Sequence, residues 1–297
     1  MEKLSRSHDG FFRKLMSETS RVKQYLNAYL PEPIKRMIVF DTLELDNDSY
    51  IDEKLKQSFS DVVFKAETDA GIGINLCFLF EHKSYIDEKA PFQMLHYVSS
   101  AMLRRAENKE PQRLILPILF YHGKDSWKYQ TIFDHFPELS DALSCYLPNF
   151  DYIYHDLQRQ SDKDIEERFD SVTAASFLAL KHYHNRAYLV DRMRFFLLGS
   201  IDEDGNLYKP LIVYYLNKIP GEIEKIEVIM SEIPAAQQPE FISALDAYEN
   251  RGADKKTRQT CINMIRLGME INLICEALEV DEDYVKNVIN DLDQNTY

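Results

Sequence analysis

Three charged residues stand at the ends of two apolar segments, where their chemistry can be combined. Asp61 directly precedes the run Val62–Phe64, and Glu81 and Lys83 follow the run Leu76–Phe80. In a strand, side chains two positions apart share a face at about 6 to 7 Å, so Glu81 and Lys83 are expected to point together. If the two segments pair as a hairpin, Asp61 reaches the same face. The pattern therefore predicts two carboxylates and an ammonium group in one cluster.

Two neighbouring carboxylates offer hard oxygen ligands for Mg²⁺, which usually binds proteins through one or two carboxylates plus waters and substrate phosphate. We therefore expect Asp61 and Glu81 to bind Mg²⁺. The ammonium group of Lys83 could orient or help to deprotonate an attacking water, and could offset charge in the transition state of phosphodiester hydrolysis. A structural ion pair is the simpler interpretation, and the isolated pattern would favour it because charges commonly cap strands.

A predicted helix follows these residues and adds a fourth candidate. Apolar residues recur at helical spacing between Glu88 and Arg105. Gln93 and His96 interrupt this run with polar side chains. Gln93 could hold the nucleophilic water or a phosphate, although a solvated helix residue explains it equally well. The catalytic candidates are Asp61, Glu81, Lys83 and Gln93.

The elements around these residues alternate between helical and strand-like patterns. Hydrophobic spacing predicts, in order, a helix over 8–30, strands over 37–45, 59–66 and 72–80, a helix over 88–105 and a strand over 113–121. The run 72–80 is almost wholly apolar, as expected of a strand buried on both faces. The order α-β-β-β-α-β predicts an α/β core with mixed strands.

The second half of the chain has a different pattern. From about Asp162 onward, segments of helical periodicity follow one another without an internal repeat or a Gly/Ser linker. The change of pattern falls between Tyr129 and Asp162. We therefore expect an α/β core over residues 1–150 and a mostly helical C-terminal region over residues 151–297.

Cysteine usage and hydropathy indicate the compartment. The four cysteines are far apart and form no CxxC pair, which argues against a tetrahedral zinc site or a disulfide framework and favours a reducing cytosol. The N-terminus carries charges where a signal peptide needs an apolar core. No apolar run approaches the roughly 18 residues that suggest a membrane span. We expect a cytoplasmic protein without a membrane partner.

The formal net charge of −14 is unusual for a DNA-binding protein, so its distribution matters. Residues 1–128 hold 19 Lys+Arg and 19 Asp+Glu, and the remaining residues hold 16 and 30, so the acidic excess lies in the second part. A neutral first part can still meet phosphates, because bound cations reverse the local sign of charge. The composition permits a nuclease and argues against a long non-specific basic groove.

Four segments of the chain carry a resemblance to a known family. They are His8–Leu15, Ser60–Phe64, Phe80–Ser84 and Pro117–Lys124, with Trp127 beyond them. In these motifs and their order the chain resembles the Rpn family of recombination-promoting nucleases, also labelled transposases, within the PD-(D/E)XK superfamily. The resemblance covers about the first 130 residues. It implies a restriction-endonuclease-like core and metal-dependent cleavage of DNA phosphodiester bonds.

The resemblance also implies individual roles. Asp61 takes the place of the superfamily's PD aspartate, and Glu81 and Lys83 take the (D/E)XK pair. Ser60 stands where the superfamily has proline, a tolerable departure because that proline coordinates nothing. Many relatives carry Gln at the position of Lys83, so Lys83 is not the strongest part of the match.

Two other functions compete with the nuclease. One is a catalytically silent DNA-binding or assembly protein on the same fold. The other is a DDE transposase, suggested by the family label alone. DDE chemistry needs three acids from well-separated elements, whereas Glu81 and Lys83 lie two residues apart at the end of one strand. The nuclease hypothesis suits this spacing better.

Other polar residues favour structural roles. Glu44 and Asp46 in the first predicted strand are expected at a solvated edge. His122, in the turn after a buried strand, is expected to be structural. At the C-terminus, helical segments over 271–278 and 282–288 suggest a helix-turn-helix, but the candidate recognition helix, Asp281–Asn287, opens with three acids that would repel phosphates. We expect an interaction or dimerisation segment there, and so a homo-oligomer formed through the helical C-terminal region.

Overall fold

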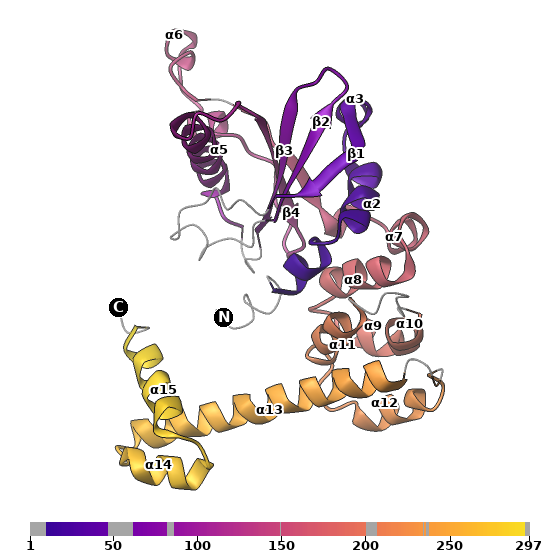
Figure 1. The fold of residues 1–297 in the computed structure, drawn as a ribbon, viewed down its shortest axis with the longest axis vertical. Helices are drawn as coiled ribbons and strands as arrows, with labels where there is room; N and C mark the ends of the chain where they lie inside the picture. Colours follow the sequence, from indigo (N-terminus) through magenta and orange to yellow (C-terminus); the bar gives the residue numbers. More distant parts are fainter. Residues whose placement is uncertain are drawn as a thin grey trace. The chain divides into compact units, whose positions relative to one another are not determined.

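The computed structural model describes residues 10–46, 62–81, 86–148, 150–199, 207–233, 235 and 238–294. The chain forms two compact units, Met1–Gln237 and Gln238–Tyr297. In the first unit a sheet is combined with helices, and the described part of the second contains helices alone (Figure 1). The predicted mixed α/β class is confirmed.

The first helical segment is interrupted. Residues 10–15 are helical, and helix α2 (Thr19–Tyr29) begins after a break at 16–18. The prediction of one continuous helix is therefore wrong at this point. Local contacts explain the break: the Ser17 hydroxyl donates to a backbone carbonyl of the preceding turn, and Glu18 adopts an extended conformation (φ −94°) as the N-cap of α2.

Five strands form one sheet in the order β1-β2-β3-β4-β5. They cover Ile38–Leu45, Val62–Thr68, Gly73–Glu81, Leu114–Tyr121 and Ile153–Asp156, and the short helix α3 (Glu32–Met37) leads into the first. β1, β2 and β3 pair antiparallel, whereas β3, β4 and β5 pair parallel. The first four strands confirm predicted ones. β5 has no counterpart among the predictions, because four residues that include two polar side chains give no clear periodicity.

Helix α5 (Ala90–Glu107) covers one face of the sheet (Figure 1). Its buried side chains join those of the strands and following turns in one cluster of Val63, Ala90, Met94, Tyr97, Ala101, Ile115, Leu119, Tyr121, Trp127 and Tyr152. Strand alternation explains the membership, since the odd-numbered residues of β2 and β4 share this face. Because β3 and β4 pair parallel, α5 runs back along the sheet between them, so its first turn lies toward the C-terminal ends of these strands.

The opposite face packs against α2 and α8 (Ser171–Lys181). The ring centroid of Phe120 in β4 lies 4.9 Å from that of Phe12, 6.0 Å from that of Tyr25 and 5.8 Å from that of Phe177. β4 is thus buried on both faces, as its almost continuous apolar sequence predicts.

The remaining helices of the first unit are short. Between β4 and β5 lie η1 (Phe133–His135) and α6 (Asp141–Ser144), and η2 (Leu157–Arg159) follows β5. Then come α7 (Asp162–Arg168), α8, α9 (Arg186–Asp191), α10 (Met193–Leu198), α11 (Tyr208–Leu216) and α12 (Ile223–Met230). The predicted boundary at residue 150 falls inside this unit, ahead of β5.

The second unit contains α13 (Gln238–Arg266), α14 (Ile271–Leu278) and α15 (Glu282–Gln294). Ile274, Val285 and Val288 are fully buried with Cys261 in its small core. Glu279 ends α14 in the left-handed conformation (φ 54°) that often closes a helix. The predicted pair of C-terminal helices is confirmed, and its role in oligomerisation stays a prediction.

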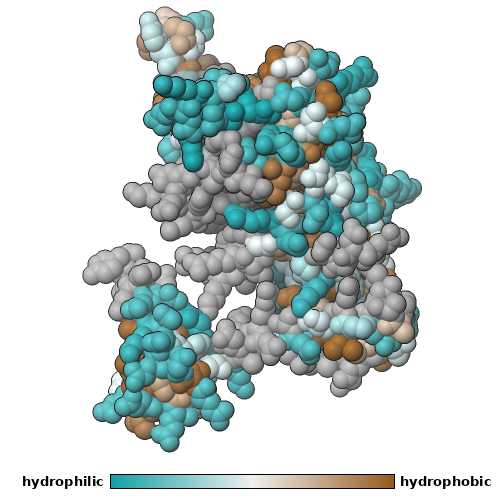
Figure 2. All heavy atoms as spheres, viewed as in Figure 1, coloured by the Kyte–Doolittle hydropathy of each residue, from teal (hydrophilic) through white to brown (hydrophobic). Residues whose placement is uncertain are grey.

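The view in Figure 2 shows mainly hydrophilic side chains on each unit, with hydrophobic ones among them. Exposed apolar residues include Leu143 of α6 and, in the second unit, Leu267 and Leu273. Within the described parts of the chain, no helix combines the length and the apolar character that crossing a membrane requires.

Candidate functional site

The C-terminal ends of the parallel strands bring three positions into one row. Glu81, the last residue of β3, is in register with Tyr121 at the end of β4. Tyr121 is in register with Asp156 at the end of β5. Positions in register on neighbouring strands belong to the same face of a sheet. Because Tyr121 packs in the cluster under α5, the row belongs to the α5 face.

The metal-binding prediction falls largely outside the described residues. Asp61 and Lys83 lie outside them, as does the side chain of Glu81. Asp61 directly precedes Val62, the first residue of β2, which pairs with Phe78. Among the residues that the structure describes, no group of three or more His, Cys, Asp or Glu side chains could hold a metal ion. The pair Asp61 and Glu81 stays a prediction.

Gln93 is the predicted site residue whose side chain the structure describes. It is the fourth residue of α5, in the first turn, toward the C-terminal ends of β3 and β4. Its side-chain oxygen is buried and has no hydrogen-bond partner within the described chain. Leaving a buried acceptor unsatisfied costs roughly 1–3 kcal/mol. Such an atom is expected where water or a ligand completes the hydrogen bonding.

Structural contacts hold the turn after β4. The imidazole of His122 is 1% exposed and donates through Nδ1 to the carbonyl oxygen of Leu180 at 3.0 Å. The hydroxyl of Tyr121 donates to the carbonyl oxygen of Asp125 at 2.7 Å, and burial raises the pKa of Tyr121 to about 12. Gly123 is required by this packing, because an added Cβ would lie 2.3 Å from the Tyr121 hydroxyl oxygen. The predicted structural role of His122 is confirmed.

Asp156 is a carboxylate at this edge that sequence analysis missed. It is 6% exposed, accepts from the backbone N–H of Gln158 at 3.0 Å and pairs with Arg159 at 3.2 Å. Burial, the largest influence, raises the pKa of Asp156 despite these two partners. The sequence holds no signal for it, since β5 itself has no distinct pattern.

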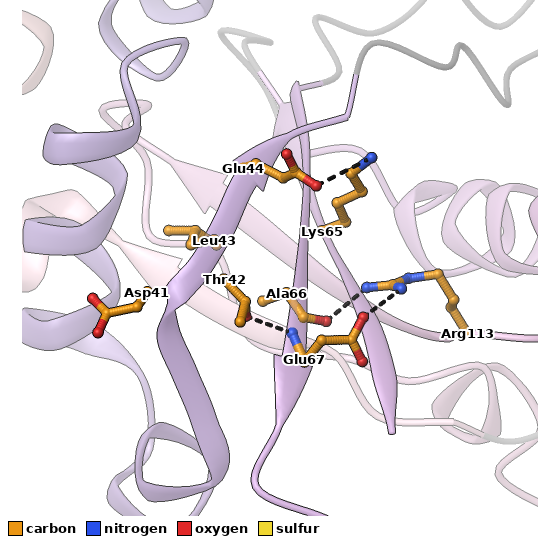
Figure 3. Close-up of a pocket in the computed structure, with 8 residues that line it drawn as sticks. All are labelled: Asp41, Thr42, Leu43, Glu44, Lys65, Ala66, Glu67 and Arg113. Carbon is orange, nitrogen blue, oxygen red and sulfur yellow. Dashed lines mark hydrogen bonds and ion pairs between the residues drawn. The ribbon is translucent and has the colours of Figure 1, made fainter. Parts of the chain in front are cut away.

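A pocket of about 410 Å³ lies over β1 and β2, toward the edge of the sheet opposite β5 (Figure 3). The Arg113 guanidinium donates to the Glu67 carboxylate at 2.8 Å and to the carbonyl oxygens of Ala66 and Ile74 at 2.6 and 3.0 Å. Lys65 pairs with Glu44 at 3.3 Å. These groups bind one another, so the pocket does not present them to a ligand.

A β-bulge produces this pocket. The register of β1 against β2 shifts between Val39 and Glu44. The Thr42 hydroxyl replaces the missing ladder contacts, since it accepts from the Glu67 backbone N–H at 2.9 Å and donates to the Val39 carbonyl oxygen at 2.6 Å. The extra residues bend the strand away from its neighbour and leave the space between them.

The two acids predicted at the solvated edge of β1 differ. The Glu44 side chain is 67% exposed, as predicted. The prediction is wrong for Asp46, which is 8% exposed. The Asp46 backbone N–H donates to the Val63 carbonyl oxygen at 2.8 Å, so contact with β2 continues past the end of β1 and buries this residue.

Comparison with known proteins finds a matching family model and relatives that are named recombination-promoting nucleases. The chain matches the family model described as "Putative transposase, YhgA-like" over residues 6–201. It is 30% identical to the inactive recombination-promoting nuclease-like protein RpnE of Escherichia coli strain K12, over 68% of each chain. It is 26% identical to the recombination-promoting nuclease RpnD of Escherichia coli O157:H7, over 77% of this chain and 87% of that protein.

A third relative matches a shorter segment. The chain is 32% identical to the recombination-promoting nuclease RpnA of Escherichia coli strain K12, over 41% of this chain and 42% of that protein. No solved structure matches the chain. The family model alone covers well over half of the residues. The chain therefore belongs to the family of YhgA-like transposases and recombination-promoting nucleases.

Proposed function

We propose that the chain is a Mg²⁺-dependent DNA endonuclease, in which Asp61 and Glu81 bind the metal and Lys83 and Gln93 act on the attacking water. One observation carries the proposal. Glu81 ends β3 in register with Tyr121, and α5 begins toward the same end of the sheet, where the Gln93 oxygen in its first turn is buried without a partner in the described chain. Relatives that are named recombination-promoting nucleases support it.

The topology supports a restriction-endonuclease-like core of the PD-(D/E)XK type. A helix precedes three antiparallel strands, and α5 then leads to β4, which pairs parallel to β3. This is the order that the family resemblance implies. The crossover through α5 places the C-terminal end of β3 and the start of α5 at the same end of the sheet.

Strand alternation favours a single face for the proposed site. Position 61 is two residues from Val63, which packs in the cluster under α5, so it belongs to that face if the strand extends to it. Position 81 is in register with Tyr121, another member of the cluster. Position 83 is two residues beyond position 81. The α5 face is therefore the expected location of all three residues and of Gln93.

The donor set fits Mg²⁺, because two carboxylates are hard ligands of the kind this ion prefers, and the unpartnered Gln93 oxygen can accept from a water that the ion carries. Bound Mg²⁺ would supply charge stabilisation to the phosphate and lower the pKa of a coordinated water. Asp61 and Glu81 would hold it through carboxylate oxygens. The Gln93 oxygen would accept a hydrogen bond from the attacking water and fix its direction. The Lys83 ammonium would donate to that water or to a phosphate oxygen and offset negative charge as it develops.

The direct test uses purified protein and supercoiled plasmid. We expect nicking with Mg²⁺ or Mn²⁺, weak activity with Ca²⁺ and none in EDTA. The rate should rise toward alkaline pH, because the attacking water must lose a proton. Undiminished cleavage in EDTA would refute the metal-dependent mechanism.

A second candidate function is DNA binding or assembly without catalysis. The observation in its favour is that RpnE, which is 30% identical over 68% of this chain, is named an inactive protein. The two candidates differ in a simple experiment. A silent protein would retard plasmid in a gel and leave it supercoiled with either Mg²⁺ or Mn²⁺, whereas the proposed nuclease would convert it to nicked and linear forms.

A further inference from the structure

A second pocket, of about 470 Å³, opens at the start of β5 and is lined by four tyrosines, four apolar residues and one aspartate. Tyr29, Tyr129, Tyr152 and Tyr154 line it, and Asp151 is the one charged residue of its lining. Leu116, another lining residue, precedes Tyr121 by five positions in β4, which is about 16 Å along a strand. The pocket is therefore distinct from the proposed catalytic edge.

Hydrogen bonds fix three of the tyrosine rings in place. The Tyr152 hydroxyl donates to the Gln130 carbonyl oxygen at 2.5 Å, and the Tyr154 hydroxyl donates to the Trp127 carbonyl oxygen at 2.9 Å. The ring centroid of Tyr129 lies 4.7 Å from that of Tyr152 and 6.4 Å from that of Tyr154. These rings need no reordering to receive a ligand, so little conformational entropy is lost on binding.

The polar groups of the pocket are acceptors. Asp151 accepts from the Tyr129 hydroxyl at 3.2 Å, a neutral donor that leaves the carboxylate charge in place. The Tyr29 hydroxyl is buried and has no hydrogen-bond partner within the described chain. Burial first, and then the charges of Asp151 and Asp134, raise the pKa of Tyr129, which indicates a negative environment.

Charges from the neighbouring helix do not reverse this environment. At Tyr29, burial is the largest influence and raises the pKa to about 12. Arg168 and Asp164 of α7 act on that pKa in opposite directions, so their effects partly cancel. The pocket combines tyrosine rings, apolar side chains and a carboxylate.

We propose that this tyrosine-lined pocket binds a guanidinium group. A planar guanidinium stacks on aromatic rings and also donates several N–H hydrogen bonds, which the Asp151 carboxylate can accept. A quaternary ammonium would use the rings but leave the Asp151 carboxylate without a donor. A phosphate-bearing ligand would meet the Asp151 carboxylate and be repelled. The guanidinium matches both the tyrosine rings and the Asp151 carboxylate of the lining.

The guanidinium can come from free arginine-like molecules or from an arginine side chain of a partner protein. Both sources share the chemistry, and titration of the full-length protein separates them. One arm uses N-acetyl-arginine amide, and the other uses a short glycine-flanked peptide with a single arginine. Equal affinity would identify a small-molecule site, and clearly tighter peptide binding would identify a partner segment. Either result supports the pocket, provided that N-acetyl-citrulline amide, the uncharged isostere, binds at least about tenfold more weakly.

Variants locate the binding. Tyr129→Leu removes a ring and Asp151→Asn removes the charge, and each should weaken binding about tenfold, whereas Tyr129→Phe keeps the ring and should change affinity less than about threefold. Both sites are on the exposed rim, so the fold should tolerate them, and circular dichroism would verify this. Tyr146→Leu, at a tyrosine that is 81% exposed and outside the pocket, is the matched control. Equal binding of the arginine and citrulline probes, no binding of either, or equal affinity in Tyr129→Leu would overturn the proposal.

Discussion

Two polar clusters, one over β1 and β2 and one beside the sheet at the start of α5, differ in whether their polar groups have hydrogen-bond or ion-pair partners. Over β1 and β2, Arg113 binds Glu67 and Lys65 binds Glu44, and the pocket contains these internal pairs (Figure 3). In the first turn of α5, the Gln93 oxygen is buried without a donor in the described chain. The first cluster has more charge, and the second has a buried acceptor without a hydrogen-bond donor. The unsatisfied acceptor is the better indicator of a ligand site.

The difference has an energetic basis. A paired, partly buried charge has already exchanged its water for protein partners, so binding a ligand there would first require breaking those contacts. A buried acceptor without a donor has lost its hydrogen bond to water, and no hydrogen bond within the described chain replaces it. A water or ligand that supplies the donor therefore stabilises the second site and would destabilise the first.

Removal of the proposed metal ligands should have the largest effect. Asp61→Ala or Glu81→Ala should lower single-turnover cleavage of plasmid by roughly 10³-fold or more, because a positioned metal and its water are lost together. The free energy of unfolding should hold or rise in the metal-free protein, since repulsion between like charges is relieved. Glu44→Ala, in the internally paired cluster, is the control and should cleave normally. Full metal-dependent cleavage by either acid variant would remove that residue from the site.

Lys83 should show a smaller and more selective effect. Lys83→Met, similar in length but without donors, should lose on the order of 10²-fold in single-turnover rate. Lys83→Gln should keep measurable Mg²⁺-dependent cleavage, because an amide can still aim the water without carrying charge. If both variants lose activity equally, the charge itself is required. If neither does, Lys83 has no part in the reaction.

The internally paired cluster should affect stability alone. Arg113→Met leaves Glu67 and two carbonyl oxygens without their donor, and Arg113 is only 15% exposed, so urea unfolding should show a loss of about 2–3 kcal/mol. Lys65→Met breaks a pair that is 37% and 67% exposed and should cost less than about 1 kcal/mol. Cleavage by both variants should match that of the original protein wherever they are folded. A loss of cleavage in folded Arg113→Met would contradict the division between the two clusters.

Most of the elements around the two clusters could be predicted from the sequence. The elements and contacts that could not be predicted were missed for physical reasons. Long apolar runs revealed β2, β3 and β4, and helical periodicity revealed α5, because burial on a regular element leaves a repeating pattern. β5 and Asp156 escaped, since four residues are too few for a period. The burial of Asp46 and the bulge in β1 also escaped, because both depend on pairing with β2. The charged groups over β1 and β2 have partners, and the Gln93 oxygen has none in the described chain. This difference depends on contacts in three dimensions, which the sequence pattern does not reveal.

The smallest effect should come from Gln93, and it bears most directly on the comparison. Gln93→Met keeps the length of the side chain and removes the acceptor. If the oxygen only aims a water, single-turnover cleavage should fall about tenfold. At the same time the free energy of unfolding should stay level or rise by up to about 1 kcal/mol, because a buried acceptor without a donor no longer has to be accommodated. This combination separates the two clusters, since Arg113→Met should lose stability and keep its rate. His96→Met, two residues beyond Met94 on the exposed side of α5, is the matched control and should change neither quantity. A Gln93→Met protein that unfolds more easily and cleaves normally would show that Gln93 is a structural residue, and the buried oxygen would then no longer support the proposed site.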